Sequence, residues 1–412
     1  MPTDLPKILL VSELTLSFSQ AGKSSNPTLF NLFSQYPPEL LWQFTTDFSA
    51  EYTPPVAPFE DRITSSKTQY LTQFNNRLGI TFNPWLNYLN FSLLDWLPIP
   101  ELQKIKQFKP DLILICPITP WGLFVGNKLR KYFDCPFVIY FMDDWIAIQN
   151  QNLLSQKIQR TTRELLQKAS GWLMISEQLQ ADLSSRYNVS PQYALVAHNP
   201  VEILNQELPS ESAVRSEVFK IIYAGSIQVM HYDAVAAVAE AIFQMRQEGK
   251  KIELILYTAQ FFWDSYQDSW QQWEVKYGGL IDYKELNKYL KAADLLLVAT
   301  SFLPENSHAI RSSILTKMTD YMAAGRTILS CGPEYSACNI FLKQWDCGLV
   351  CETNQVSEIK VFLEHQIEQS QSNYNLAIKA FKVLMDNFEG KKVRSKLYNF
   401  LAAVNKNKRY QD

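Results

Sequence analysis

The residue pattern with the clearest chemical meaning lies in the segment Arg311–Pro333, which reads RSSILTKMTDYMAAGRTILSCGP. Ser312 or Ser313 is a suitable N-cap and Gly325 a suitable C′ residue, so the segment predicts a helix of about three turns. The first turn of a helix presents free N–H groups and the positive end of the helix dipole. The start of this helix is therefore predicted to bind an anion such as a diphosphate.

Charged side chains make this prediction more specific. Arg311 and Lys317 add positive charge near the start of the predicted helix. Asp320 lies eight residues beyond Ser312, which corresponds to about 12 Å along a helix axis. A carboxylate is suited to accept hydrogen bonds from two vicinal hydroxyls, as in a ribose. These residues predict a nucleoside diphosphate site, with the phosphates at the helix start and the ribose at Asp320.

The two sides of the predicted helix differ in polarity. Its apolar residues are expected to pack on a sheet, and they are Ile314, Leu315, Met318, Tyr321 and Met322. Its polar residues fall on the other side, and they are Ser313, Thr316, Lys317 and Asp320. The alternative to a binding site is an ordinary amphipathic helix whose polar side faces solvent.

Short, continuous apolar runs alternate with helical patterns along the chain, which is typical of parallel strands covered on both faces. The strands predicted in the first half are Lys7–Ser12, Asp111–Cys116, Pro136–Met142, Gly171–Ser176 and Tyr193–Ala197. Those predicted in the second half are Phe219–Ala224, Lys251–Tyr257, Asp294–Ala299 and Thr327–Ser330. We predict the α/β fold class, with two doubly wound, Rossmann-like domains that face a cleft and bind ligands beyond the carboxyl ends of their strands.

The domain boundaries follow from the same alternation, and a length of 412 residues suits two domains. Residues 1–204 are predicted to form an N-terminal domain, and the polar stretch 205–217 a linker. Residues 218–372 are predicted to form the C-terminal domain that carries the Arg311–Pro333 segment. The remaining residues, 373–412, are predicted to form a C-terminal helix, for which packing back on the N-terminal domain is one arrangement.

Composition excludes several classes of protein. A formal net charge of −2 argues against a general nucleic-acid binder, which needs a basic face. The six cysteines include no C-x-x-C pair, so we expect buried free thiols rather than a zinc site or a disulfide framework. The N-terminal residues do not have the pattern of a signal peptide, and no apolar run approaches the roughly 20 residues that cross a bilayer. We expect a cytoplasmic protein with at most peripheral membrane contact.

The segment 316–329, with the Cys331–Pro333 turn, resembles the donor-binding helix of retaining glycosyltransferases with the GT-B fold, glycosyltransferase family four and its relatives. The resemblance implies that this helix binds a nucleotide-sugar donor. Three positions depart from the family signature. Asp320 stands where the family has its second glutamate, Ser312 stands where many members have the first, and Thr327 replaces a proline.

Further segments carry the resemblance. Gly225 and Ser226 correspond to the glycine-containing turn that lets the backbone approach the donor diphosphate, although a plain turn is the alternative. The resemblance places Gly279 and Ile281 near the nucleotide base. In the N-terminal domain it implies a glycine-bearing loop near the donor phosphate and the acceptor, and the residues there are Gly22, Asn26 and Thr28, with a surface loop as the alternative.

Two adjacent carboxylates, Asp143 and Asp144, follow the predicted strand Pro136–Met142. Retaining relatives place a histidine or an acidic residue near this position, which makes the pair the candidate catalytic residues. Because adjacent residues point in alternating directions, we expect at most one of them to face the site. The alternative roles are holding the acceptor hydroxyl or the positive charge that develops on the sugar, and capping the following helix. The resemblance implies no catalytic metal and no cofactor, since the nucleotide sugar is a substrate.

A segment rich in aromatic residues, Thr81–Pro100, is the candidate for membrane contact. Its apolar side chains suit a membrane interface, but it has no flanking lysines, and the alternative is an interior helix.

The sequence predicts a glycosyltransferase that moves a sugar from a UDP- or GDP-sugar to a glycan or lipid-linked acceptor, with retention. The alternatives are a GT-B sugar-nucleotide epimerase and a non-catalytic, nucleotide-binding relative in a glycan-assembly complex.

Overall fold

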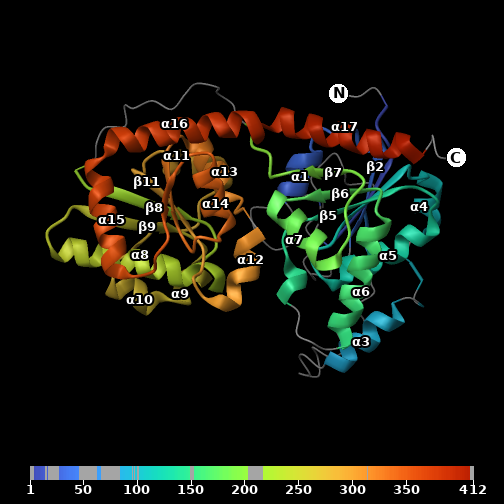
Figure 1. Cartoon of the computed structure of the whole chain (residues 1–412), viewed down its shortest axis with the longest axis horizontal. Helices are drawn as coiled ribbons and strands as arrows, with labels where there is room; N and C mark the ends of the chain where they lie inside the picture. The colour runs from blue at the N-terminus through green and yellow to red at the C-terminus, as the bar shows by residue number, and fades with distance from the viewer. Residues whose placement is uncertain are drawn as a thin grey trace. The chain divides into compact units, whose positions relative to one another are not determined.

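The computed structural model describes residues 4–13, 16, 27–45, 63–65, 84–94, 96, 98–99, 102–148, 153–202, 217–312 and 314–408. The chain divides into two compact units (Figure 1). The first unit is Met1–Pro200 together with Lys391–Asp412, and the second is Val201–Gly390. The sequence had placed a boundary at residue 373, but this position lies inside a helix of the second unit. Most of the predicted linker, residues 205–216, lies outside the described residues.

The first unit contains a parallel sheet with the strand order β3-β2-β1-β4-β5-β6-β7. Its strands are β1 (Ile8–Ser12), β2 (Leu41–Thr45), β3 (Ile63–Ser65), β4 (Leu112–Cys116), β5 (Phe137–Phe141), β6 (Gly171–Met174) and β7 (Ala194–Val196). Every residue of β1, β4 and β5 is buried, as the continuous apolar runs predicted. The chain runs outward in one direction from β1 and in the other from β4, so the strand order reverses between these two strands.

Helices pack on both faces of this sheet. They are α1 (Pro27–Phe33), α3 (Pro84–Leu93), α4 (Leu102–Phe108), α5 (Pro120–Leu129), α6 (Leu153–Lys168), α7 (Glu177–Tyr187) and α17 (Gly390–Lys408). Alternate side chains of β1 serve opposite faces, because Leu9 packs in the core beneath α5 and α6 while Leu10 packs in the core beneath α1 and α17. The last helix, α17, is fixed to α1 by the Tyr398 hydroxyl, which donates to the Leu32 carbonyl at 3.0 Å.

The second unit contains a parallel sheet with the strand order β10-β9-β8-β11-β12-β13. Its strands are β8 (Phe219–Ala224), β9 (Ile252–Tyr257), β10 (Lys276–Tyr277), β11 (Leu295–Ala299), β12 (Thr327–Cys331) and β13 (Leu349–Cys351). The strand order reverses between β8 and β11. In doubly wound sheets, ligands bind beyond the carboxyl ends of the strands at such a reversal.

The helices of the second unit also cover both faces of its sheet. They are α8 (Val229–Gln247), α9 (Gln260–Asp264), α10 (Gln267–Gln272), α11 (Tyr283–Leu290), α12 (Ser307–Ser312), α13 (Lys317–Ala324), α14 (Ala337–Gln344), α15 (Val356–Glu368) and α16 (Ser370–Asn387). One core lies beneath α8 and α15, and the other beneath α13, α14 and α16. Among the helices that the structure describes in both units, none is long and apolar enough to cross a membrane.

Candidate functional site

The loop after β8 lies at the strand reversal of the second unit. Gly225 follows the last residue of β8 and has a φ of +128°, in the region that favours glycine. A Cβ atom at this position would lie 3.3 Å from Nζ of Lys317. The Tyr223 hydroxyl donates to the Ser226 carbonyl at 2.6 Å and fixes the turn. The backbone at Gly225 therefore closely approaches the Lys317 side chain.

The helix that carries Lys317 begins later than the sequence predicted. Ser312 is the last residue of α12, where its hydroxyl donates to the His308 carbonyl at 3.2 Å, so it does not cap the following helix. Helix α13 comprises Lys317–Ala324, and its C-cap Gly325 has the expected left-handed conformation with a φ of +66°. Asp320 thus lies three residues beyond the helix start, about 4.5 Å along the axis, so the predicted spacing of about 12 Å is wrong.

The amine of Lys317 is buried. Its Nζ has no hydrogen-bond acceptor among the described residues and lies 3.7 Å from the centroid of the Tyr223 ring. Burial lowers the pKa of Lys317 to about 7. The alternative of a polar helix side that faces solvent therefore does not hold for the ammonium group of Lys317, because Gly225 and Tyr223 cover it.

A second buried basic group, His231, lies in the first turn of α8. Its side chain is 4% exposed, and its Nδ1 accepts a hydrogen bond from the Gln228 backbone N–H at 3.3 Å. Its Nε2 is buried and has no partner within the part of the chain that is described. Burial, together with the neighbouring charge of Lys317, lowers the pKa of His231 to about 3. Two basic groups without acceptors thus adjoin the start of a long helix, which is the composition of an anion site.

The sequence analysis did not identify His231. Helix α8 begins at Val229. This start places His231 in the first turn, three residues beyond Gln228, where a side chain contacts the free N–H groups of the helix start. The available signal was the position of a basic residue a few residues after the Gly225 turn.

The α13 helix is tied directly to the Gly225 loop. The Tyr321 hydroxyl accepts a hydrogen bond from the Ala224 backbone N–H at 2.8 Å and donates to the Ala224 carbonyl at 3.3 Å. Met318 and Met322 are buried beside it, as the predicted apolar side of the helix requires. Asp320 is half-buried and lies one turn beyond Lys317. The structure therefore brings Lys317 to the Gly225 loop, with Asp320 on the same helix.

The other predicted donor-site residues lie on neighbouring elements of the second unit or are not described. Arg311 is exposed on α12, with its guanidinium 5.2 Å from the centroid of the Tyr335 ring. Gly279, with a φ of +79°, and Ile281 lie in the loop between β10 and α11, two strands from β8. Thr316 is exposed at the N-cap of α13 and makes no side-chain capping bond. The predicted residues Gly22, Asn26 and Ser313 lie outside the described residues.

In the first unit, the two carboxylates after β5 have different surroundings. Asp144 is 2% exposed and accepts two hydrogen bonds from Arg186 of α7, at 2.8 and 2.5 Å. Burial raises the pKa of Asp143, the Trp145 backbone N–H lowers it, and the charge of Asp144 raises it. Because Asp144 is committed to an ion pair, Asp143 is the better candidate for contact with a substrate.

Glu13, which the sequence analysis did not identify, lies at the strand reversal of the first unit, directly after β1. Its buried carboxylate accepts hydrogen bonds from the backbone N–H groups of Ile118, Thr119 and Gly122, at 2.8, 2.6 and 3.0 Å. Burial raises the pKa of Glu13. This carboxylate fills the N-terminus of α5, so that helix start is not a vacant anion site.

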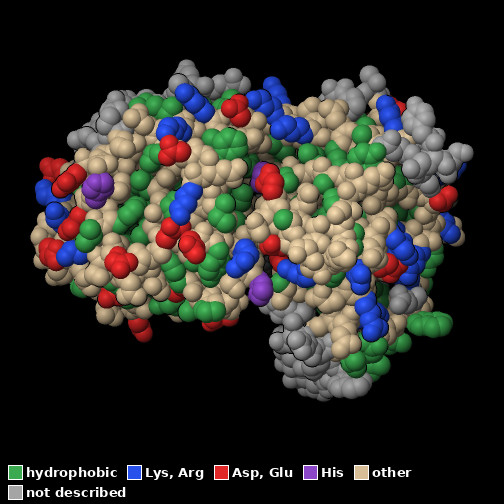
Figure 2. Space-filling model, viewed as in Figure 1, with side chains coloured by type: hydrophobic (Ala, Val, Ile, Leu, Met, Phe, Trp, Pro, Cys, Tyr) green, Lys and Arg blue, Asp and Glu red, His purple; other side chains and the backbone are tan. Residues whose placement is uncertain are grey.

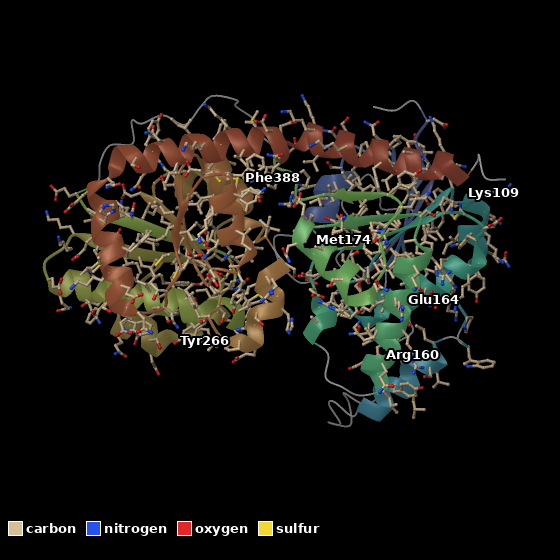
Figure 3. The ribbon with its side chains drawn as sticks, viewed as in Figure 1. Lys109, Arg160, Glu164, Met174, Tyr266 and Phe388 are labelled. Atoms are coloured by element: carbon tan, nitrogen blue, oxygen red, sulfur yellow. The ribbon has the colours of Figure 1, made fainter. Side chains whose placement is uncertain are left out.

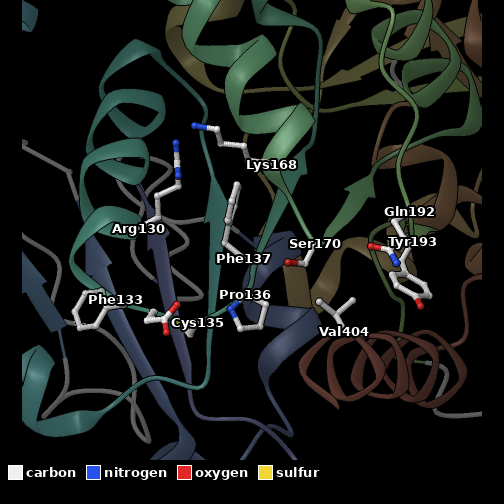
Figure 4. Close-up of a pocket in the computed structure, with 11 residues that line it drawn as sticks. Arg130, Phe133, Cys135, Pro136, Phe137, Lys168, Ser170, Gln192, Tyr193 and Val404 are labelled. Carbon is white, nitrogen blue, oxygen red and sulfur yellow. The ribbon is translucent and has the colours of Figure 1, made fainter. Parts of the chain in front are cut away.

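A cavity of about 370 Å³ lies at the amino ends of strands β5, β6 and β7 in the first sheet (Figure 4). Its lining includes Pro136, Ser170 and Tyr193, each of which directly precedes β5, β6 or β7. Two basic residues of its wall, Arg130 and Lys168, are both paired with Glu164. The cavity is therefore separate from the carboxyl ends of the strands, where ligands of doubly wound sheets bind.

The comparison with known proteins identifies the fold. No sequence-family description and no curated protein sequence matches the chain. HepE from Anabaena in complex with UDP is similar over 96% of this chain and 100% of that one, with a TM-score of 0.68 and 15% identity. Sucrose-phosphate synthase from Thermosynechococcus elongatus is similar over 96% of this chain and 99% of its own, with a TM-score of 0.68 and 12% identity. The trehalose 6-phosphate synthase of Burkholderia multivorans is similar over 99% of this chain and 98% of its own, with a TM-score of 0.68 and 11% identity. The chain has the GT-B fold that the sequence predicted.

Proposed function

We propose that this protein is a glycosyltransferase that uses a nucleoside diphosphate sugar as its donor. The observation that carries the proposal is the buried, unpaired Nζ of Lys317 beside the Gly225 backbone and the unpaired Nε2 of His231. A buried amine without an acceptor destabilises a folded protein, and a bound anion that accepts its hydrogen bonds removes this cost. The ligand that suits two such groups at the start of α8 is an anion with several acceptor oxygens.

Position in the fold makes a diphosphate the best candidate for this anion. The site lies at the strand reversal of a doubly wound sheet, where such folds bind nucleotides. Asp320, one turn along α13, supplies a carboxylate for the ribose hydroxyls. The similar HepE structures contain UDP and UDP-glucose, which makes UDP the first nucleotide to test.

In the proposed reaction, the bond between the anomeric carbon of the sugar and the diphosphate oxygen breaks. A hydroxyl oxygen of the acceptor forms the new bond to that carbon, and its proton passes to the departing diphosphate. The negative charge that develops on the leaving diphosphate is stabilised by Lys317 and by the N–H groups at the start of α8. The resemblance to family four supports retention at the anomeric carbon, and a glycan or a lipid-linked sugar as the acceptor, for which Asp143 is the candidate contact.

Calorimetric titration with UDP tests the donor site. We expect Lys317→Met to weaken UDP binding by about 10- to 100-fold, because a hydrogen bond between charged groups contributes about 1.5–3 kcal/mol. Lys382→Met is the matched control, since Lys382 is exposed on α16. Equal affinity of Lys317→Met and the wild type for UDP would contradict the assignment. Turnover then separates the alternatives, because an epimerase converts the donor without an acceptor and a non-catalytic relative does not convert it at all.

A further inference from the structure

Helix α3 of the first unit has apolar side chains on its inner and outer sides. Phe91 and Leu94 are buried, at 5% and 2% exposure. On the outer side, Leu89 is 50% exposed and Leu93 46%, and Trp96, just beyond the helix, is 87% exposed. The spacing of these three residues, i, i+4 and i+7, places them in one stripe. A surface helix is normally polar on its outer side, so this stripe requires an explanation.

The contacts of α3 with its own unit are made by its inner side and its last carbonyl groups. The Phe91 ring lies 4.5 Å from that of Trp121, measured between centroids. The Nζ of Lys157 donates to the Phe91 carbonyl at 2.9 Å, and that of Lys128 donates to the Leu94 carbonyl at 2.6 Å. Basic side chains at the C-terminus of a helix stabilise it and fix its position. The helix is thus held with its apolar stripe outward.

Helix α6 lies beside α3 and supplies positive charge to the same region (Figures 1 and 3). Leu153, Arg160 and Arg163 are exposed along one side of α6. The only carboxylate in the described residues of α3 and α6 is Glu164, and it is paired with Arg130 and Lys168. Figure 2 shows hydrophobic and basic side chains next to one another where Figure 1 draws α3 and the lower end of α6.

We propose that this surface binds the headgroup region of an anionic lipid bilayer. We call it the α3–α6 surface and define it by Leu89, Leu93, Trp96, Leu153, Arg160 and Arg163. Its leucines and Trp96 enter the boundary between headgroups and acyl chains, where tryptophan is enriched. Its arginines are attracted to the negative surface potential of the bilayer. The aromatic segment Thr81–Pro100 itself contains no basic residue, and the fold supplies basic residues from α6.

Vesicle flotation with the full-length protein tests the proposal. We expect binding to vesicles of phosphatidylglycerol and phosphatidylcholine, and little binding to phosphatidylcholine alone. Each basic residue near an anionic surface raises the membrane partition constant roughly five-fold. The double variant Arg160→Gln with Arg163→Gln should therefore lower this constant about 30-fold. Leu93→Gln with Trp96→Gln should weaken it roughly ten-fold or more. The same binding by the wild type should decrease as the salt concentration rises.

Matched controls come from the second unit. Val361 is 65% exposed on α15, and Lys250 is exposed after α8, so Val361→Gln and Lys250→Gln should bind vesicles like the wild type. Equal melting temperatures establish that the variants are folded. Equal vesicle binding of all variants, or equal binding to neutral and anionic vesicles, overturns the proposal. So does light scattering that shows a dimer which Trp96→Gln dissociates, because the surface then binds a second copy of the chain. None of these assays involves the donor site, so their outcome is independent of the proposed function.

Discussion

The substitution Lys317→Met should stabilise the protein while it weakens donor binding. In the wild type, burial lowers the pKa of Lys317 from its ordinary value of 10.5 to about 7. At about 1.4 kcal/mol per pH unit, this difference corresponds to a penalty of about 5 kcal/mol once the amine is fully protonated. Methionine has a similar shape and no charge, so it removes the penalty. It also removes the contact with the Tyr223 ring, which contributes about 2 kcal/mol when desolvated. The expected net stabilisation below pH 7 is therefore roughly 2–4 kcal/mol.

The pH dependence identifies the cause of this stabilisation. Between pH 7 and 10.5 the unfolded chain binds a proton at Lys317 that the folded chain does not bind, so the contribution of Lys317 to folding stability becomes less unfavourable as the pH rises. The advantage of Lys317→Met over the wild type should therefore decrease by about 3 kcal/mol between pH 7 and 9.5. With UDP bound, the wild type should be more stable than Lys317→Met, because UDP provides the acceptor for the protonated amine.

Urea unfolding at about pH 6, 7 and 9.5, followed by circular dichroism with and without UDP, measures these differences. The chain has two units, so two transitions are expected, and only that of the second unit should respond. The exposed Lys382→Met variant should change neither transition. If Lys317→Met is less stable than the wild type at every pH, or if its advantage does not depend on pH, the amine is not buried without a partner and the reasoning is refuted.

Three further predictions concern the Gly225 loop of the second unit and the Asp144–Arg186 pair of the first. Gly225→Ala should weaken UDP binding at least about ten-fold by calorimetry, because Gly225 has a positive φ and Lys317 lies close to it. The control Gly249→Ala, at a φ of +86° with open space around it, should leave the affinity for UDP unchanged. Tyr321→Phe should lower the unfolding free energy by about 1–3 kcal/mol in urea, because it leaves a buried N–H without its acceptor. Arg186→Met should cost about 3–5 kcal/mol in the same assay, because it leaves Asp144 as an unpaired buried charge, and a loss below 1 kcal/mol would contradict the buried ion pair.

Several features of the fold were accessible from local sequence because they depend on local patterns. Continuous apolar runs reveal strands buried on both faces, and they located β1, β4, β5 and β8 to within about two residues. Gly325 marked the end of α13 because its left-handed conformation favours glycine. The start of α13 was wrong because Ser312 has the chemistry of an N-cap but belongs to the preceding helix α12. A helix start depends on which of several suitable residues the chain uses, and tertiary packing decides this.

The sequence by itself thus determined the fold class, with two doubly wound domains, and the segment that carries the candidate donor site. The tertiary structure alone decided which groups face one another there. The burial of Lys317 against Gly225 and Tyr223, and its proximity to His231, join residues that are more than 80 positions apart. The pairing of Asp144 with Arg186 and the position of α6 beside α3 are likewise contacts between distant segments. Hydrophobic periodicity reports that a face is covered, but not by which side chain, because burial is non-directional whereas a binding site depends on specific neighbours.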